Sequence, residues 1–413
     1  MQSERLMEYP DDPQAILRMS TTPEGKQDPH RLFSHMRSIT PTWHDADSGM
    51  LYLLNYRDCQ EAMRSADFGA PDLLRKSPAF EGSASLQFLA DALSNMDPPQ
   101  HTRIRSQVQR SFSVRVLDRS KAHVEALVAA RISDLEKRER FDLVADYAAR
   151  IPADVICSLL GVPNEDQGKF FEWLAPQFRL LSPTPPTAEV LREADDALAA
   201  LVSYIESLIA SRRENPQVDL ISELVATQEN SEDPISLREM AVTLAILLAG
   251  GTDTTKTAIS VGLQLLLEHP DQVRMLHSEP ALVRTAFEEI VRYAGAVVVT
   301  NSRRALRDTT LGDQSIAAGD YVVPVLAAAN RDPDRFENPE QFDITRNPNP
   351  HIGFGGGVHV CVGNMLARMV GHVAIPALLS ALPGIELEQT TRDVDLQLPA
   401  MLGLKTLPVR RTH

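Results

Sequence analysis

Apolar residues recur at three- and four-residue spacing over most of the chain between Asp97 and Pro270. This spacing predicts a succession of amphipathic helices. Prolines interrupt the pattern and mark expected helix boundaries at Pro152, Pro163, Pro183, Pro185, Pro186, Pro216 and Pro234. Two of the predicted helices, 164–181 and 188–213, flank the stretch 183–186, which we interpret as a helix-to-helix loop.

Strand-like runs are short and lie near the two ends of the chain. They are 51–54, 297–300, 321–325 and 404–409. The sequence therefore predicts a mainly α protein with small β-sheets, an α+β class without repeats or a flexible interdomain linker.

The longest predicted helix begins at a capping box, Ser236-Leu237-Arg238-Glu239, and its apolar pattern continues to His269, just before Pro270. About 34 residues at 1.5 Å per residue make a rod of roughly 50 Å, which would cross the whole protein. The middle of this helix, GGTDTT over 250–255, is polar and glycine-rich. It excludes a membrane span and leaves a deformable point inside a buried helix.

The composition is that of a globular protein, with 43% hydrophobic and 23% charged residues among 413. A net charge of −15 argues against general nucleic-acid binding, which requires an excess of Lys and Arg. The first thirty residues lack the basic start and apolar run of a secretion signal, and contain no segment long enough to span a bilayer. We therefore expect a soluble cytoplasmic protein without a membrane span.

Three cysteines, Cys59, Cys157 and Cys361, are too widely separated for a disulfide framework or a paired-cysteine zinc site. Two of them are interpreted as inert core residues. Cys361 lies within FGGGVHVCVG, residues 354–363, directly before a helical pattern that begins at Asn364. A cysteine in this position meets the positive end of the helix dipole and unpaired amides, and both favour the thiolate. Such a sulfur is a ready metal ligand.

The residues around this sulfur suit a flat, bulky group. Gly355, Gly357 and Gly363 allow the backbone to turn tightly and to approach such a group closely. Phe354 can pack beneath it, and His359 can donate a hydrogen bond to an anionic edge.

Three other interpretations of this segment compete. A dinucleotide-binding loop is one, but Gly353-x-Gly355-x-x-Val358 matches that motif imperfectly, and no clear strand or βαβ unit leads into it. A zinc site would need more ligands nearby than His351 and His359. A surface turn over a buried thiol accounts for the glycines but not for the combination.

The segment 354–363 resembles the haem-binding signature of the cytochrome P450 superfamily and matches its defining positions. The resemblance implies a P450 fold in which haem b lies between the long central helix and the helix after the cysteine. It implies that Cys361 is the proximal ligand of the haem iron, that His359 meets a haem propionate, and that amides after the cysteine tune the sulfur. Residues 28–413 are expected to form one haem domain after an N-terminal extension, 1–27.

Further motifs similar to those of the family lie upstream in the expected order. The segment 250–255 is similar to the oxygen-activation segment, so the resemblance implies that Asp253 and Thr254 supply protons during catalysis. A Thr hydroxyl in a helix can bond back to the carbonyl four residues earlier, which opens the helix enough for oxygen and water to lodge there. Without the resemblance, the pair would be interpreted as a solvated acid beside a β-branched residue.

Glu289 and Arg292 lie one helical turn apart and are similar to the buried, structural Glu-x-x-Arg pair of the family. Family members usually add a third basic residue from a later segment, where this chain has Gln341. We therefore expect the polar network to be closed differently.

Three basic residues match propionate-binding positions of the family. His101 and Arg105 lie one turn apart in a motif that begins at Asp97, and Arg303 lies five residues before Asp308. As isolated basic residues, all three would be interpreted as surface charges.

The resemblance implies a monooxygenase that inserts one oxygen atom from O2 into a lipophilic small molecule, such as a secondary metabolite, a steroid or a fatty acyl chain, in a hydroxylation or a related oxidation. Because no flavin or iron-sulfur domain follows the haem loop, we expect electrons from NAD(P)H to reach a monomeric enzyme through a separate ferredoxin and ferredoxin reductase. The basic residues expected to dock an acidic partner are Arg103, Arg105, Arg110, Arg115 and Arg368.

A peroxygenase and a non-enzymatic haem sensor remain as alternatives. The Asp253-Thr254 pair argues against the peroxygenase, because that enzyme needs no proton relay. Substrate contacts are expected mainly from apolar residues, which suit a lipophilic substrate. They are 86–93, the helices around Pro183, Ile246 and Ala249, Val297 and Val298, and Leu402 with its neighbour Met401.

Overall fold

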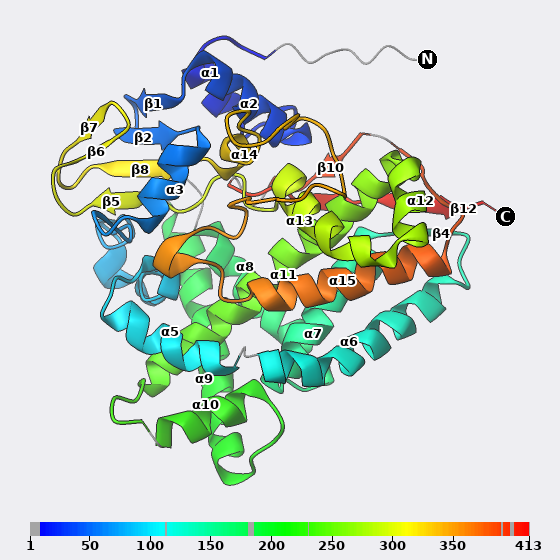
Figure 1. The fold of residues 1–413 in the computed structure, drawn as a ribbon. Helices are drawn as coiled ribbons and strands as arrows, with labels where there is room; N and C mark the ends of the chain where they lie inside the picture. Colours follow the sequence, from blue (N-terminus) through cyan, green and yellow to red (C-terminus); the bar gives the residue numbers. More distant parts are fainter. Residues whose placement is uncertain are drawn as a thin grey trace.

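The structure is a computed structural model that describes residues 9–111, 114–180, 186–229, 231–389, 391–396 and 400–412. The helices are α1 Pro13–Met19, α2 Pro29–Ile39, α3 Tyr56–Arg64, α4 Ala84–Ala90, α5 Gln100–Ser111, α6 Val114–Leu135, α7 Arg150–Leu160, α8 Gln167–Arg179, α9 Ala188–Glu214, α10 Leu220–Glu229, α11 Leu237–Glu268, α12 Pro270–Ser278, α13 Val283–Ala294, α14 Leu326–Ala329 and α15 Asn364–Ala381. Most of them gather on one side of the molecule, opposite the largest sheet (Figure 1).

The strands form small sheets. They are β1 Thr42–Asp45, β2 Met50–Leu53, β3 Phe68–Gly69, β4 Arg140–Asp142, β5 Arg303–Ala305, β6 Thr309–Leu311, β7 Gln314–Ile316, β8 Tyr321–Pro324, β9 Ile385–Leu387, β10 Asp393–Val394, β11 Leu404–Thr406 and β12 Pro408–Arg411. The largest sheet has the order β1-β2-β8-β5-β3, in which only β2 and β8 are parallel. A three-stranded sheet has the order β4-β12-β9, and β6-β7 and β10-β11 form separate pairs. The predicted mainly α class with small sheets is confirmed.

The predicted long helix is α11, and its start follows from the capping box. The Ser236 hydroxyl accepts a hydrogen bond from the Glu239 amide at 3.2 Å, and the Ser236 amide donates to the Glu239 carboxylate at 2.7 Å. These two bonds satisfy amides that the first helical turn leaves unpaired. The helix ends at Glu268, with His269 as its C-cap, before α12 begins at Pro270. Both predicted ends are therefore confirmed.

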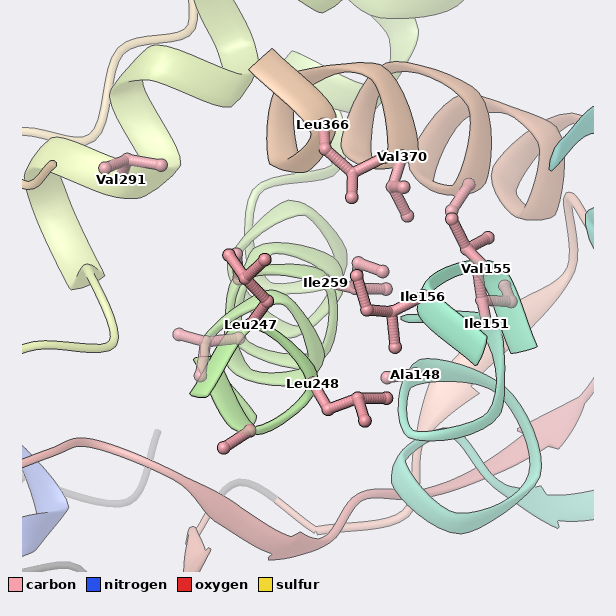
Figure 2. Close-up of a cluster of buried hydrophobic side chains, with 14 of the residues drawn as sticks. Ala148, Ile151, Val155, Ile156, Leu247, Leu248, Ile259, Val291, Leu366 and Val370 are labelled. Atoms are coloured by element: carbon pink, nitrogen blue, oxygen red, sulfur yellow. The ribbon is translucent and has the colours of Figure 1, made fainter. Parts of the chain in front are cut away.

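Helix α11 runs through the helical side of the molecule and contacts α7, α9, α13 and α15 (Figure 1). Figure 2 shows Ile156 of α7, with Leu366 and Val370 of α15, pointing toward this helix. Residues on nearly all sides of α11 are buried, which explains why its apolar pattern is broader than that of a surface helix. None of the helices in the described parts of the chain is long and apolar enough to cross a membrane.

Most other predicted elements correspond to observed ones, with shifted ends. The predicted helix 188–213 is α9, whereas α8 is shorter than predicted, because residues 164–166 form a separate 3₁₀ turn. The predicted strand 404–409 is divided into β11 and β12. Of the loop predicted over 183–186, residues 183–185 lie outside the described residues.

The strand predicted over 297–300 is wrong. Val297 forms only an isolated bridge with Met401, and the amides of both Val298 and Val299 donate to the Ala400 carbonyl, at 3.0 and 3.1 Å. Two successive amides that converge on one carbonyl cannot continue a regular ladder, in which alternate residues face the partner strand. The β-branched composition of this run favours extended backbone, but the pairing ends after one bridge.

The boundary proposed between residues 1–27 and 28–413 stays a prediction. Within the earlier segment, helix α1 packs on α2, and the Ile16 side chain is fully buried in the main core. The Lys26 ammonium donates to the Met401 carbonyl at 3.1 Å. At least part of the predicted N-terminal extension is therefore integrated with the rest of the fold.

The Glu289–Arg292 pair is wholly buried in α13. The Arg292 guanidinium donates two hydrogen bonds of 2.8 Å to the Glu289 carboxylate. A third basic residue from a later segment does join the pair: Arg346 Nε lies 3.2 Å from Glu289 Oε2, so the network is completed from position 346 and not from position 341. Gln341 contributes its backbone carbonyl, which accepts from Arg292 at 3.1 Å. Arg346 lies in an irregular segment, whose local sequence does not indicate that it turns back toward α13.

We expect Glu289→Gln to lower the free energy of unfolding by about 3–5 kcal/mol, because the guanidinium groups of Arg292 and Arg346 would remain buried without a carboxylate. Chemical denaturation measures this loss. The control is Glu386→Gln, which removes a half-exposed ion pair with Arg410 and is expected to cost less than about 1 kcal/mol. Equal destabilisation by both substitutions would contradict the assignment of Glu289 as the centre of the network.

Candidate functional site

A cavity of about 330 Å³ separates one face of α11 from the segment around Cys361. The sequence-predicted site residues that line it are His101, Arg105, Ile246, Thr254, Val297, Phe354, Gly355, His359, Cys361 and Gly363. Residues from α5, α11, the segment after α13 and the cysteine loop thus meet at one place, although they are separated by up to 262 positions in the chain, from His101 to Gly363.

Several predicted residues do not line this cavity. They are Ala249, Asp253, Glu289, Arg292, Val298, Arg303 and Leu402. The side chains of Val298 and Leu402 are buried in the main hydrophobic core, so both pack behind the cavity wall. Ala249, Val298 and Leu402 were predicted to contact the substrate, but none of them lines this cavity.

Helical geometry explains which residues of α11 face the cavity. Thr243, Leu247, Gly250, Thr254 and Ala258 line it and follow one another at three- or four-residue spacing. Such residues form one stripe along a helix, because 3.6 residues complete a turn. A residue five positions before Thr254, as Ala249 is, lies on another face. Steps of three and four residues back from Thr254 lead to Leu247 and Thr243, two lining residues that the sequence analysis did not predict.

The cysteine loop is held by backbone geometry. The Cys361 amide donates to the Phe354 carbonyl at 2.9 Å. Gly355 and Gly357 have φ values of +72° and +62°, a region that favours glycine. A Cβ atom on Gly357 would lie 2.1 Å from the Met63 carbonyl oxygen of α3, whereas one on Gly363 would meet no atom within 4 Å. The loop is therefore tight against α3 and open at Gly363.

The start of α15 lies beside the Cys361 sulfur, as predicted, but it does not dominate the charge state of the thiol. Burial raises the pKa of Cys361, while a hydrogen bond from the Gly363 amide and the charges of Arg105 and Arg368 act in the opposite direction. Desolvation of the thiolate therefore raises the pKa of Cys361 more than the hydrogen bond from the Gly363 amide lowers it.

A cluster of basic residues, made up of His101, Arg105, Arg303 and His359, lies at and behind the edge of the cavity. The rings of His101 and His359 are 4.6 Å apart between centroids, and burial together with the charge of Arg303 lowers the pKa of His359 to about 3. Burial and the charge of Arg105 also lower the pKa of His101. Both imidazole rings therefore favour the neutral form, because burial and the neighbouring arginines oppose protonation.

Two members of the cluster have buried polar atoms without partners among the described residues. Both ring nitrogens of His101 and the Nη1 atom of Arg303 make no hydrogen bond, although the two residues are only 2% and 5% exposed. An unsatisfied buried donor costs on the order of 1–3 kcal/mol. Such donors fit an anionic group with oxygen acceptors, such as a carboxylate.

The sequence model of the family described as Cytochrome P450 matches residues 26–410. The chain belongs to the cytochrome P450 family. Its members are monooxygenases, and this P450 is therefore a haem-thiolate oxidoreductase that uses O2. The resemblance inferred from residues 354–363 is confirmed.

Named relatives agree with this assignment. Polyketide biosynthesis cytochrome P450 PksS of Bacillus subtilis (strain 168) is 36% identical over 329 residues, 79% of each chain. The 6-deoxyerythronolide B hydroxylase of Saccharopolyspora erythraea is 34% identical over 324 residues, 78% of each chain. The crystal structure of myxobacterial cytochrome P450 CYP267B1 in complex with myristic acid has a TM-score of 0.85 and 34% identity, and covers 95% of this chain and 98% of that chain.

The residues of this P450 fit a haem group. The unpartnered donors of His101 and Arg303 suit the two carboxylates of haem b, and the open space at Gly363 allows a flat macrocycle to approach the loop. Cys361 provides the sulfur on the cavity wall. The haem-binding roles of the individual residues belong to the proposal below.

On α11, the Thr254 hydroxyl donates to the Gly250 carbonyl at 2.7 Å, which is the backbone bond predicted for it. Asp253 does not reach the cavity, and its carboxylate pairs with the Lys256 ammonium at 2.8 Å. Thr254 therefore lies on the cavity wall, while Asp253 lies one residue away, on a different face of the helix.

The predicted docking arginines have different surroundings. Arg103 pairs with Glu239, Arg105 donates to the Val360 carbonyl at 2.6 Å, and Arg368 pairs with Glu288. The side chains of Arg110 and Arg115 lie outside the described part of the structure. Two of the predicted arginines are thus already paired with carboxylates.

We expect Gly357→Ala to reduce the amount of haem bound per chain, because its Cβ atom would collide with the Met63 carbonyl at a positive φ. The matched control is Gly356→Ala, since Gly356 has an extended backbone and its Cβ atom would meet the Met63 side chain at 3.4 Å. Haem content is measured with the pyridine haemochrome assay. Full haem content in Gly357→Ala would show that the tight contact with α3 is dispensable.

Proposed function

We propose that this P450 inserts one oxygen atom from O2 into a lipophilic small molecule of the fatty acyl, polyketide or steroid type. The observation that carries the proposal is the cavity itself, in which the Cys361 loop faces an α11 stripe that includes Thr254. The side chains that face the substrate space are mainly apolar, among them Leu93, Ile246, Leu247 and Val297.

Several names of relatives support this substrate class. PksS is named for polyketide biosynthesis, and CYP267B1 was solved with myristic acid. A further similar structure is P450BioI in complex with hexadec-9Z-enoic acid ligated acyl carrier protein, with a TM-score of 0.87, 29% identity, and coverage of 94% of this chain and 99% of that chain. Two of these proteins were solved with a fatty acid or a fatty acyl ligand, and the apolar cavity suits such a substrate.

In this proposal, Cys361 is the proximal iron ligand, and its thiolate supplies the electron density that favours O2 activation when haem b is bound. His101, Arg105, Arg303 and His359 bind the propionates through their polar hydrogens. Phe354, Gly355 and Gly363 form the surface on which the macrocycle lies. These roles use the donors and the open backbone described above.

Proton delivery is assigned to Asp253 and Thr254. The Thr254 hydroxyl gives its hydrogen to the Gly250 carbonyl, so its oxygen is available as an acceptor at the cavity wall. The Asp253 side chain is 29% exposed, so a rotation away from the Lys256 ammonium would bring its carboxylate into contact with external water. The pair can thus move a proton from the exterior to the cavity across one residue of α11.

Electrons are proposed to come from NAD(P)H through a separate ferredoxin and ferredoxin reductase, in the cytoplasm. The cysteine loop and the first turn of α15 expose three apolar side chains, Val358, Val360 and Met365. The guanidinium group of Arg105 lies against the same loop and donates to the Val360 carbonyl at 2.6 Å. An apolar patch beside positive charge suits a small acidic electron carrier.

We expect the ferrous carbon monoxide complex to show the red-shifted absorption band of a thiolate ligand, and Cys361→His to abolish it, because an imidazole donates less electron density. Cys157→Ala is the control, since this buried cysteine lies outside the cavity lining. If the Cys361→His protein kept the band, the ligand assignment would be wrong.

The substrate class is tested by a screen for the spin-state shift of the haem with fatty acids, macrolactones and steroids. With the compound that gives the largest shift, we expect Thr254→Ala to release most reducing equivalents as hydrogen peroxide instead of product, because the proton relay is interrupted. Product formed per NAD(P)H consumed is the measurement, with a surrogate ferredoxin and its reductase as electron source.

Thr252→Ala is the matched control for that experiment. Its hydroxyl also bonds to the helix backbone, at 3.0 Å from the Ala249 carbonyl, but it does not line the cavity. Unchanged coupling in Thr254→Ala would remove this residue from the mechanism. Turnover with peroxide but never with the electron-transfer proteins would replace the proposed monooxygenase by a peroxygenase.

A further inference from the structure

We propose that Glu288 of α13 sets the reduction potential of the haem iron by neutralising Arg368, the cation beside the cysteine loop. This inference rests on the proposed role of Cys361 as the iron ligand. Glu288 precedes the buried structural residue Glu289 but faces a different neighbour, which is α15. It is therefore a positioning residue, acting on the site through Arg368.

The contact between the two residues is bidentate. Arg368 Nε donates to Glu288 Oε1 at 2.6 Å, and Nη2 donates to Oε2 at 2.9 Å. The remaining terminal nitrogen of Arg368 donates to the Asn364 side chain at 2.6 Å. Since the side chains of Arg368 and Glu288 are 32% and 24% exposed, they are partly shielded from water. A paired fork of this kind holds the cation in one orientation.

A histidine fixes the Glu288 carboxylate from the other side. His351 Nε2 lies 2.9 Å from Glu288 Oε2, and His351 Nδ1 accepts a hydrogen bond from the Gly353 amide at 3.2 Å. Because Nδ1 is an acceptor, the ring hydrogen is on Nε2 and is donated to the carboxylate. Together, the hydrogen bonds from His351 and Arg368 overcome burial and lower the pKa of Glu288 to about 2. Glu288 is therefore ionised at neutral pH.

The same cluster contacts the cysteine loop directly. The Arg368 guanidinium carbon lies 4.4 Å from the centroid of the Phe354 ring, and the His351 ring lies 5.8 Å from it. The Phe354 carbonyl accepts the Cys361 amide, so Phe354 connects the charged cluster to the cysteine. Arg368 is therefore separated from the cysteine loop by the Phe354 ring alone.

The electrostatic consequence follows from the sign of the charges. Reduction of the iron adds one negative charge to the centre, and a positive charge nearby stabilises the reduced state. Glu288 cancels much of the field of Arg368, because the two groups are in contact and partly buried. Removal of the carboxylate charge should therefore favour the ferrous state, and removal of the arginine charge should favour the ferric state.

The experiment is a spectroelectrochemical titration of the substrate-free holoprotein and its variants. We expect E288Q, which keeps the size of the side chain, to shift the ferric–ferrous equilibrium about tenfold toward the ferrous state, which is 59 mV for a one-electron couple. R368Q should shift the equilibrium in the opposite direction, and the double variant E288Q/R368Q should return close to the parent. E386Q, which removes one carboxylate charge from a surface ion pair with Arg410, should leave the potential unchanged.

The signs distinguish a charge effect from a structural one. If E288Q and R368Q shift the potential in the same direction, or if both keep the thiolate band of the carbon monoxide complex with an unchanged potential, the inference is overturned. Should R368Q fail to retain haem, the charge-conserving R368K replaces it and should keep the parent potential. Failure of the Cys361 assignment is visible separately, because the parent protein itself would then lack the thiolate band.

Discussion

The wholly buried ion pair between Glu289 and Arg292 is the interaction on which the rest of the structure depends. Arg292 also donates to the carbonyls of Asn330 and Pro339, and the Glu289 carboxylate accepts from the Asp343 amide. One helical turn of α13 thus organises the irregular chain between α14 and the cysteine loop. Backbone without regular structure must find partners elsewhere when it is buried, and this pair supplies them.

Two adjacent carboxylates of α13 have different partners and different roles. Glu289 points into the interior and stabilises the segment before the cysteine loop, whereas Glu288 pairs with Arg368 at the start of α15. Both residues belong to one helix. A shift of α13 would therefore move the segment before the cysteine loop together with the carboxylate that pairs with Arg368. Helix α11 provides the opposite wall of the cavity. Gly250 and Gly251 are part of this wall and place no side chain in the cavity.

The distribution of charge in this P450 is opposite to its overall balance. The chain carries a net charge of −15, yet two guanidinium groups, those of Arg105 and Arg303, lie beside the rings of His101 and His359 near the cavity. Concentrating positive groups in a buried place is unfavourable unless an anion joins them. In the proposed holoprotein, the two carboxylates of haem b would offset this cost by accepting hydrogen bonds from these residues.

The sequence by itself determined the features that depend on neighbouring residues: the capped start and the end of α11, the extent of α9, the glycine loop around Cys361 and the bond from Thr254 to Gly250. Caps, helical periodicity and positive φ angles involve residues within about four positions of each other. Only the tertiary structure decided that Arg346 completes the Glu289 network, that Glu288 occupies Arg368, and that residues 297–300 form no strand. These outcomes depend on contacts across 40 or more positions, for instance 57 between Glu289 and Arg346, and no local spacing encodes which distant charge or carbonyl will be nearest.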